Sequence, residues 1–259
     1  MIGGGVSTLA LLAAAVAIAS FVQGTIGVGF ALILAPTLGV LAPELLPGAL
    51  LLVMLPLNAW VAWRERSALD RRGAGRITVG RIFGGVAGLL VLMALPAGGL
   101  QAFVGAATIL TALVTLLAPR FEPGRATFLV AGAVTGVTET ATGIGGPPLA
   151  LAYQHRPAPV LRATVAACFL VGELLSVALL LLAGRMSGVQ FEAATLLLPP
   201  LALGLVLSHA ARHRVGGRLF RALVLGFAIV SGAVCLWPTV SHGWADRRHE
   251  SGATATRLF

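Results

Sequence analysis

The chain contains no lysine, and only 10% of its 259 residues are charged. A soluble domain carries about 25% charged residues, so a water-facing globule of this length would lack the polar side chains to cover its surface. The soluble classes are therefore excluded. A Walker-type nucleotide site requires lysine and is excluded too, and no G-x-S-x-G or H-E-x-x-H motif occurs, so nothing in the sequence predicts an enzyme.

Cysteine is almost as scarce. Cys168 and Cys235 both lie inside apolar runs and outside any spacing motif, where cysteine packs as a small hydrophobic side chain. His209 and His213 stand four residues apart, but arginines surround them and no carboxylate is near. We therefore expect no disulfide, no metal and no cofactor.

Long apolar runs make up most of the chain, whose mean hydropathy is +0.95. They lie near 6–22, 26–42, 44–63, 77–96, 99–118, 126–142, 146–155, 163–184, 193–211 and 219–237. These runs are apolar on every face, which a transmembrane barrel strand is not. The sequence predicts an all-α, polytopic protein of about 8–10 helical segments in the cell membrane, with the lipid bilayer as its surroundings.

The positive charge fits this interpretation. The formal net charge of +9 comes from 18 arginines that stand mainly between the apolar runs. In that position arginine is typical of topology signals and lipid contacts, so the charge does not predict nucleic-acid binding.

Two glycine-rich stretches interrupt the runs, QGTIGVG at 23–29 and TGIGGPP at 142–148. One helix over 6–42 would be about 55 Å long, whereas the hydrocarbon core is about 30 Å thick. The chain must therefore break or double back, and glycine weakens a helix where it does so.

An offset of 116 residues superimposes the two stretches, with Gly27 on Gly143, Gly29 on Gly145 and Gln23 on Glu139. This indicates an internal repeat. We expect a first membrane repeat over 1–118, a second over 119–238 and a polar, disordered tail over 239–259.

The arginines predict how the repeats are oriented. If the chain turns round at each glycine break, twelve arginines lie on one side of the membrane and four on the other; if it does not, the division is eleven to five. The positive-inside rule favours the first count, with both termini outside. Each repeat then has five segments, so the two are inverted, as in many secondary transporters.

The breaks have the composition of an anion site, because glycine lets backbone amides converge and a following helix start adds partial positive charge. The alternative is that these glycines only permit close packing, as we expect of Gly80, Gly84, Gly88, Gly132 and Gly136. The candidate binding residues are Gln23, Thr25, Gly27, Gly29, Asn58, Thr140, Thr142, Gly143, Gly145 and Gly146.

Two carboxylates, Glu139 and Glu173, lie well inside apolar runs. A charge at membrane depth costs about 2.5–3.5 kcal/mol on insertion scales, so such groups are usually functional. We assign both to proton coupling. For Glu139 the alternative is a structural hydrogen bond to Thr140 or Thr142, and for Glu173 the alternative is a purely structural role. Arg81 stands near the start of its run, where we expect its side chain to reach the membrane interface; the alternative is a contact with the bound anion.

The segments FVQGTIGVGFALILAP (21–36) and GAVTGVTETATGIGGPPLALAY (132–153) resemble the TauE/SafE family of sulfite exporter-type membrane proteins. The G-I-G-G-P pattern of that family is kept at 143–147, whereas Phe30 follows Gly29 where a further glycine is usual. The resemblance covers 6–238 and implies transport of small sulfur-containing or related organic anions across the plasma membrane.

The sequence as a whole therefore predicts a secondary transporter of small, sulfite-like or organosulfonate-like anions that works by alternating access. The alternative is a passive anion channel or a membrane assembly subunit. The expected partner is the small-molecule anion, with no nucleic acid, and the sequence is compatible with a homo-oligomer.

Overall fold

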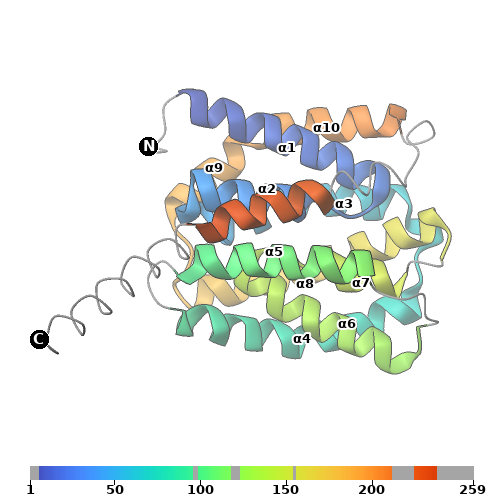
Figure 1. The fold of residues 1–259 in the computed structure, drawn as a ribbon. Helices are drawn as coiled ribbons and strands as arrows, with labels where there is room; N and C mark the ends of the chain where they lie inside the picture. Colours follow the sequence, from blue (N-terminus) through green and yellow to red (C-terminus); the bar gives the residue numbers. More distant parts are fainter. Residues whose placement is uncertain (1–5, 96–98, 118–122, 154–155, 212–224, 238–259) are drawn as a thin grey trace, which may run out of the picture.

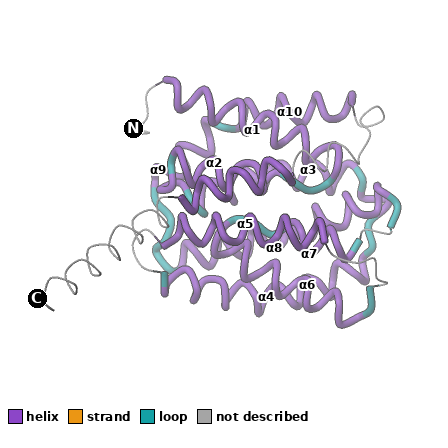
Figure 2. Tube along the Cα trace, in the orientation of Figure 1, coloured by secondary structure: helices purple, strands orange, loops and turns teal. Residues whose placement is uncertain are grey.

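The computed structural model describes residues 6–95, 99–117, 123–153, 156–211 and 225–237, and this part of the chain consists of helices and short connections without a strand (Figures 1 and 2). The predicted all-α class is confirmed. The α-helices are α1 (Val6–Ile26), α2 (Phe30–Leu41), α3 (Gly48–Arg64), α4 (Arg71–Ala94), α5 (Gly99–Leu117), α6 (Arg125–Thr142), α7 (Gly146–Ala152), α8 (Ala158–Leu182), α9 (Gly188–Leu196), α10 (Leu198–Ala211) and a further helix, Leu225–Trp237. The predicted tail over 239–259 lies outside the described residues.

The exterior of the helix bundle is apolar. Leu182 is 87% exposed, Phe83 is 74% exposed and Val206 is 69% exposed, which suits contact with lipid chains and not with water. Three helices, α1, α4 and α8, are long and apolar enough to cross a membrane. A fourth span results if α9 and α10, which meet at a bend of 41°, count as one. These features make the protein a multi-pass membrane protein.

Helix contacts pair the first half of the chain with the second. Helix α4 packs along α6, α1 packs along α10, and α3 packs against α8. Figure 1 shows α1 and α10 along one edge of the bundle and α4 and α6 along the opposite edge. Contacts between the halves, and not only within them, therefore build the interior.

Glycine makes the α4–α6 contact possible. A Cβ atom on Gly84 would lie 2.9 Å from Cα of Ala133, and one on Gly136 would lie 2.7 Å from the amide nitrogen of Gly85. Gly80 and Gly132 meet the backbone of the facing helix in the same way. The predicted packing role of these glycines is confirmed.

The chain doubles back at both predicted breaks, since α2 packs on α1 and α7 packs on α6. The interruptions are shorter than the glycine-rich motifs predicted. Helix α1 continues through Gln23 and Thr25 to Ile26, and α6 continues to Thr142. Only residues 27–29 and 143–145 are non-helical.

Candidate functional site

The two breaks have the same local geometry at their first glycine. Gly27 has φ of +96° and Gly143 has φ of +80°, a region that favours glycine. The amide of Gly27 donates to the carbonyl of Gln23 at 2.8 Å, and the amide of Gly143 donates to the carbonyl of Glu139 at 2.7 Å. Gln23 and Glu139 thus stand one turn before equivalent breaks.

The breaks also contact each other. A Cβ atom on Gly146 would lie 3.8 Å from Cβ of Val28. Val28, from the first break, packs against the apolar cluster around Phe169 of α8. Ile144, from the second break, is fully buried in the cluster formed mainly by α1, α2 and α3. Each break therefore inserts an apolar side chain into the other half of the molecule.

Side chains form hydrogen bonds with backbone groups at the breaks. The Gln23 Oε1 atom accepts from the amide of Phe30 at 3.0 Å, and the Thr142 hydroxyl accepts from the amide of Ile144 at 3.2 Å. Thr135 donates to the carbonyl of Gly145 at 3.1 Å. Gly29 is the N-cap of α2, and among the described residues no hydrogen bond is recorded for its amide.

A chain of buried polar side chains leads away from the first break. Gln23 of α1 donates to Asn58 of α3 at 3.1 Å, and Asn58 donates to Glu173 of α8 at 2.6 Å. All three side chains are at most 2% exposed. Asn58 lies in the first half of the chain and Glu173 in the second, so this bond joins the halves at the α3–α8 contact.

Another buried polar group, around Arg81 of α4, lies near the second break. Arg81 forms an ion pair with Glu139 of α6, and its guanidinium lies against Gly172, the residue before Glu173 in α8. Its guanidinium lies 5.6 Å from the ring centroid of Phe169, a cation–π contact. Phe169 in turn faces the second break, since a Cβ atom on Gly145 would lie 3.1 Å from its ring.

The expectation that Arg81 reaches the membrane interface is wrong, because the side chain is 2% exposed and lies between α4, α6 and α8. The alternative interpretation of Glu139, a hydrogen bond to a neighbouring threonine, is also wrong. Thr140 bonds to Ser176 at 2.7 Å, and Thr142 donates to the carbonyl of Thr138, whereas Glu139 is paired with Arg81.

The predicted residues divide into two groups. Gln23, Asn58, Glu139 and Glu173 are brought together, with the break glycines Gly27, Gly29, Gly143, Gly145 and Gly146 beside them. Thr25 lies apart, because its hydroxyl donates to the carbonyls of Phe21 and Val22 in its own helix. The centre therefore consists mainly of amides and ionic groups.

A model of the family described as sulfite exporter TauE/SafE matches residues 11–235, nearly the whole chain. The chain belongs to this family. No curated protein and no solved structure matches it. Membership makes it a membrane transporter of the sulfite exporter type, and the glycine breaks, the polar chain and the buried ion pair are features of this TauE/SafE protein.

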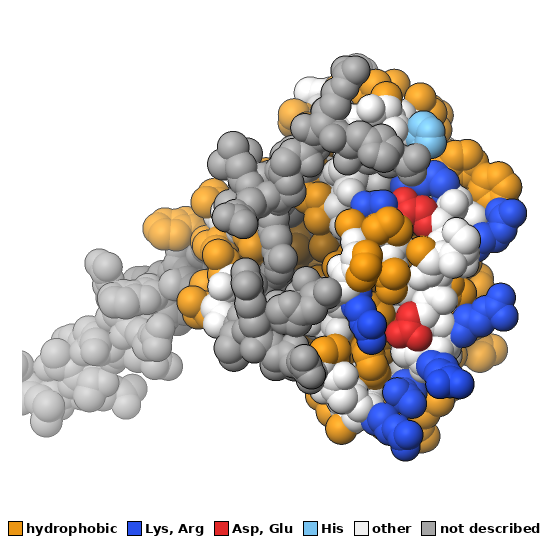
Figure 3. Space-filling view, turned by 90° about the vertical axis from the view of Figure 1, so that its right-hand side faces the viewer, with side chains coloured by type: hydrophobic (Ala, Val, Ile, Leu, Met, Phe, Trp, Pro, Cys, Tyr) orange, Lys and Arg blue, Asp and Glu red, His pale blue; other side chains and the backbone are white. Residues whose placement is uncertain are grey.

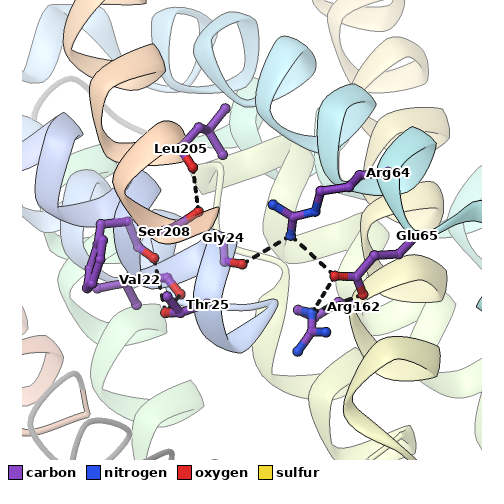
Figure 4. A network of polar contacts seen from close by, with 9 residues as sticks. Val22, Gly24, Thr25, Arg64, Glu65, Arg162, Leu205 and Ser208 are labelled. Atoms are coloured by element: carbon purple, nitrogen blue, oxygen red, sulfur yellow. Dashed lines mark hydrogen bonds and ion pairs between the residues drawn. The ribbon is translucent and has the colours of Figure 1, made fainter. Parts of the chain in front are cut away.

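A second polar network of the TauE/SafE protein lies beside the first break (Figure 4). Arg162 of α8 donates to both carboxylate oxygens of Glu65 at 2.9 Å, and Arg64 binds Glu65 at 3.2 Å. Arg64 also donates to the carbonyl of Gly24 at 3.3 Å. This network ties α3, α8 and the end of α1 together, and Arg162 packs against Gly27.

The network belongs to an arginine-rich end of the bundle. Figure 3 shows arginine side chains gathered on this face, with few acidic groups among them. The first break lies near this end. The second break instead contacts Leu50, in the first turn of α3 and far along that helix from Arg64.

Sequence reasoning missed Arg81 as a partner of Glu139, and it missed Phe169, Gly172 and Glu65. Gly172 matters because a Cβ atom there would overlap the guanidinium of Arg81. One signal was available, since Arg81 is a charge inside a run already identified as apolar. The others carry no signal in the sequence, because their roles depend on which helices face each other.

Proposed function

We propose that this TauE/SafE protein is a secondary transporter that carries small sulfur-containing anions, sulfite and organosulfonates, by alternating access. The observation that carries the proposal is the pair of buried polar groups in the bundle: the hydrogen-bonded series Gln23, Asn58 and Glu173, and the Arg81–Glu139 ion pair. Charges in a membrane interior cost several kcal/mol, so a protein keeps them there chiefly for a function.

In this mechanism the anion binds between the two halves, and the glycine breaks let the chain change shape around it. The proposed contacts are Gln23, Asn58 and the amides of Gly29, Gly145 and Gly146. The amides of Gly27 and Gly143 and the hydroxyls of Thr25, Thr140 and Thr142 already take part in hydrogen bonds within the protein. Glu139 and Glu173 couple binding to a proton. The contact between Val28 and Gly146 supports this arrangement, because it brings the two breaks together.

The paired helix contacts support an inverted repeat. By the offset of 116 residues, α1 corresponds to α6, and the second half of α4 corresponds to α10. The contact between α1 and α10 is therefore the counterpart of the contact between α6 and α4. Alternating access in such folds is movement of one repeat against the other. The Arg162–Glu65 ion pair would hold the arginine-rich end closed in the conformation described here.

Flux into liposomes tests the proposal. With the purified protein reconstituted, sulfite uptake should saturate with concentration and should respond to an imposed pH gradient. Glu139→Gln should insert and fold but lose proton-driven accumulation, whereas Glu192→Gln, which changes an exposed carboxylate on α9, should behave as wild type. Very fast flux that rises linearly with concentration would instead indicate a channel, and accumulation by Glu139→Gln at the wild-type level would refute the coupling role.

A further inference from the structure

Arg81 lies where three helices of the bundle meet. It extends from α4 toward α6 and α8, and the absence of a side chain at Gly172 of α8 leaves the space that its guanidinium occupies. The ring of Phe169 covers one side of it. The titratable groups that face it are Glu139 from α6 and Glu173 and Cys168 from α8.

The hydrogen-bonding capacity of this cluster is poorly used. Within the part of the chain that the structure describes, Nε and Nη1 of Arg81 are buried and donate no hydrogen bond. The same holds on the acceptor side for Oε1 of Glu139 and Oε2 of Glu173. A structural ion pair inside a protein normally satisfies such groups, because each buried polar atom left unpaired is destabilising.

The unused donors match an oxyanion. A guanidinium presents five N–H groups in a planar fork that binds two oxygens of one group at once. Sulfite and sulfonates carry three oxygens on one sulfur, so they can accept from Nε and the Nη atoms together. A carboxylate such as Glu139 competes for the same donors.

The net charge of the cluster determines whether the anion or Glu139 binds Arg81. Arg81 with two ionised carboxylates already has a net charge of −1, and an added anion would raise the excess of negative charge in a medium of low dielectric constant. Transfer of a proton from a hydronium ion to the released carboxylate of Glu139 breaks one O–H bond of the hydronium ion, forms one on the carboxyl group and leaves neutral water, so one negative charge is removed. The bonds of the sulfur centre do not change.

We propose that Arg81 is the anion-binding residue of this protein. Glu139 stays paired with Arg81 until Glu139 is protonated and leaves the guanidinium free for the anion, so that one proton enters the site with each anion. This inference rests on the proposed function and adds the residue that binds the substrate and the coupling that follows. Proton and anion then move in the same direction.

Binding to the full-length protein in detergent tests the inference. The dissociation constant for sulfite, and separately for methanesulfonate, is measured between about pH 5 and pH 8 for wild type and Glu139→Gln. If one proton is taken up per anion, the wild-type Kd rises by up to about tenfold per pH unit relative to Glu139→Gln. Sulfite itself titrates near neutrality, so the ratio of the two Kd values at each pH is the quantity compared.

A second pair of variants tests Arg81 itself. Arg81→Gln leaves Glu139 buried without its cation and is expected to fold poorly, so the double variant Arg81→Gln, Glu139→Gln, which removes both charges, is the informative one. It should bind sulfite at least about tenfold more weakly than Glu139→Gln, because charged hydrogen bonds are lost. The exposed Arg185→Gln is the matched control and should bind as wild type.

The possible results distinguish failure of the Arg81 proposal from failure of the proposed transport function. If the wild type binds and transports sulfite or methanesulfonate but the double variant binds equally well, Arg81 does not bind the anion. A Kd ratio that stays constant with pH overturns the competition by Glu139. If the wild type binds neither anion, the proposed function itself fails.

Discussion

At Gly172 a missing side chain decides where a charge can lie. Arg81 could not point into the bundle if α8 carried a Cβ atom at this position, because that atom would overlap the guanidinium. From its place near the start of an apolar run Arg81 is predicted to reach the interface, but Gly172 gives it room and Glu139 gives it a partner. The site therefore depends on a residue with no polar chemistry of its own.

Gly172→Ala adds only one methyl group, but we expect it to weaken sulfite binding clearly. The added methyl group forces Arg81 out of its position, and overpacking of this kind typically costs about 1–3 kcal/mol of stability. We expect a lower melting temperature in detergent together with weaker sulfite binding. Gly188→Ala, where nothing lies within 4 Å of the added atom, is the control. Unchanged binding in Gly172→Ala would mean that the position of Arg81 is not critical.

Asp70 caps α4 at the arginine-rich end, outside the membrane-spanning segment. Burial raises the pKa of its carboxyl, but hydrogen bonds from the amide of Gly73 and the hydroxyl of Tyr153, with the charge of Arg156, outweigh burial and hold the pKa below its ordinary value. The carboxylate therefore stabilises the folded state above the ordinary pKa of about 3.9. That stabilisation is lost as the pH falls through the lower pKa of the folded state.

Asp70→Asn tests this assignment through the pH dependence of stability. Asparagine can still cap the helix but cannot ionise, so the variant should be less stable than wild type at neutral pH, and the difference should shrink toward pH 3. Thermal unfolding in detergent at several pH values measures it. A difference that is the same at every pH would contradict the assignment.

At the scale of elements, the glycine face of α4 sets how closely it approaches α6. Gly80, Gly84 and Gly88 each meet the backbone of α6, while the adjacent Gly85 has only side chains at 3.5 Å from an added Cβ atom. Neighbouring glycines on one helix thus have different tolerances, and the three that are spaced four residues apart are the ones that meet the facing backbone.

Gly84→Ala should therefore separate α4 from α6, while Gly85→Ala should not. A Cβ atom on Gly84 would contact backbone atoms of Ala133, which cannot move as a side chain can. We expect a loss of about 1–3 kcal/mol for Gly84→Ala and little change for Gly85→Ala. Because Glu139 on α6 and Arg81 on α4 face each other across this contact, sulfite binding should also weaken in Gly84→Ala alone. Equal stability of the two variants would contradict this account of the α4–α6 contact.

The breaks show what pattern reasoning can and cannot resolve at this scale. Glycine content predicts where the chain leaves the helix, and the structure confirms both places. It overestimates their width, because Gln23 and Thr25 keep helical hydrogen bonds despite their glycine neighbours. A helix already started is extended at little cost, so it ends only where φ becomes positive, at Gly27 and Gly143.

At the scale of the whole molecule, the arginine-rich end defines one side of the membrane. From the positive-inside rule we expect that end to face the cytoplasm. Helix α1 runs from Val6 toward it, since the carbonyl of Gly24, near the end of α1, bonds to Arg64. The start of α1 should therefore face the outside.

Labelling in intact cells tests this orientation. A membrane-impermeant maleimide should react with Ser7→Cys, an exposed position near the start of α1, in intact cells. It should react with Ser67→Cys, an exposed position beside Arg66, only after the membrane is opened. The native cysteines Cys168 and Cys235 are buried and provide the background. The reverse labelling pattern would invert the orientation.

The sequence by itself determined the membrane class, the helical architecture and the positions of both breaks, because hydrocarbon demands long apolar helices and glycine at positive φ is a local requirement. It also singled out Glu139 and Glu173 as costly charges at membrane depth and Gln23 and Asn58 as candidate binding residues. Only the tertiary structure decided that Gln23, Asn58 and Glu173 are hydrogen-bonded in series and that Arg81 pairs with Glu139. Those contacts join helices far apart in the chain, and the composition of a segment carries no information about which helix will face it.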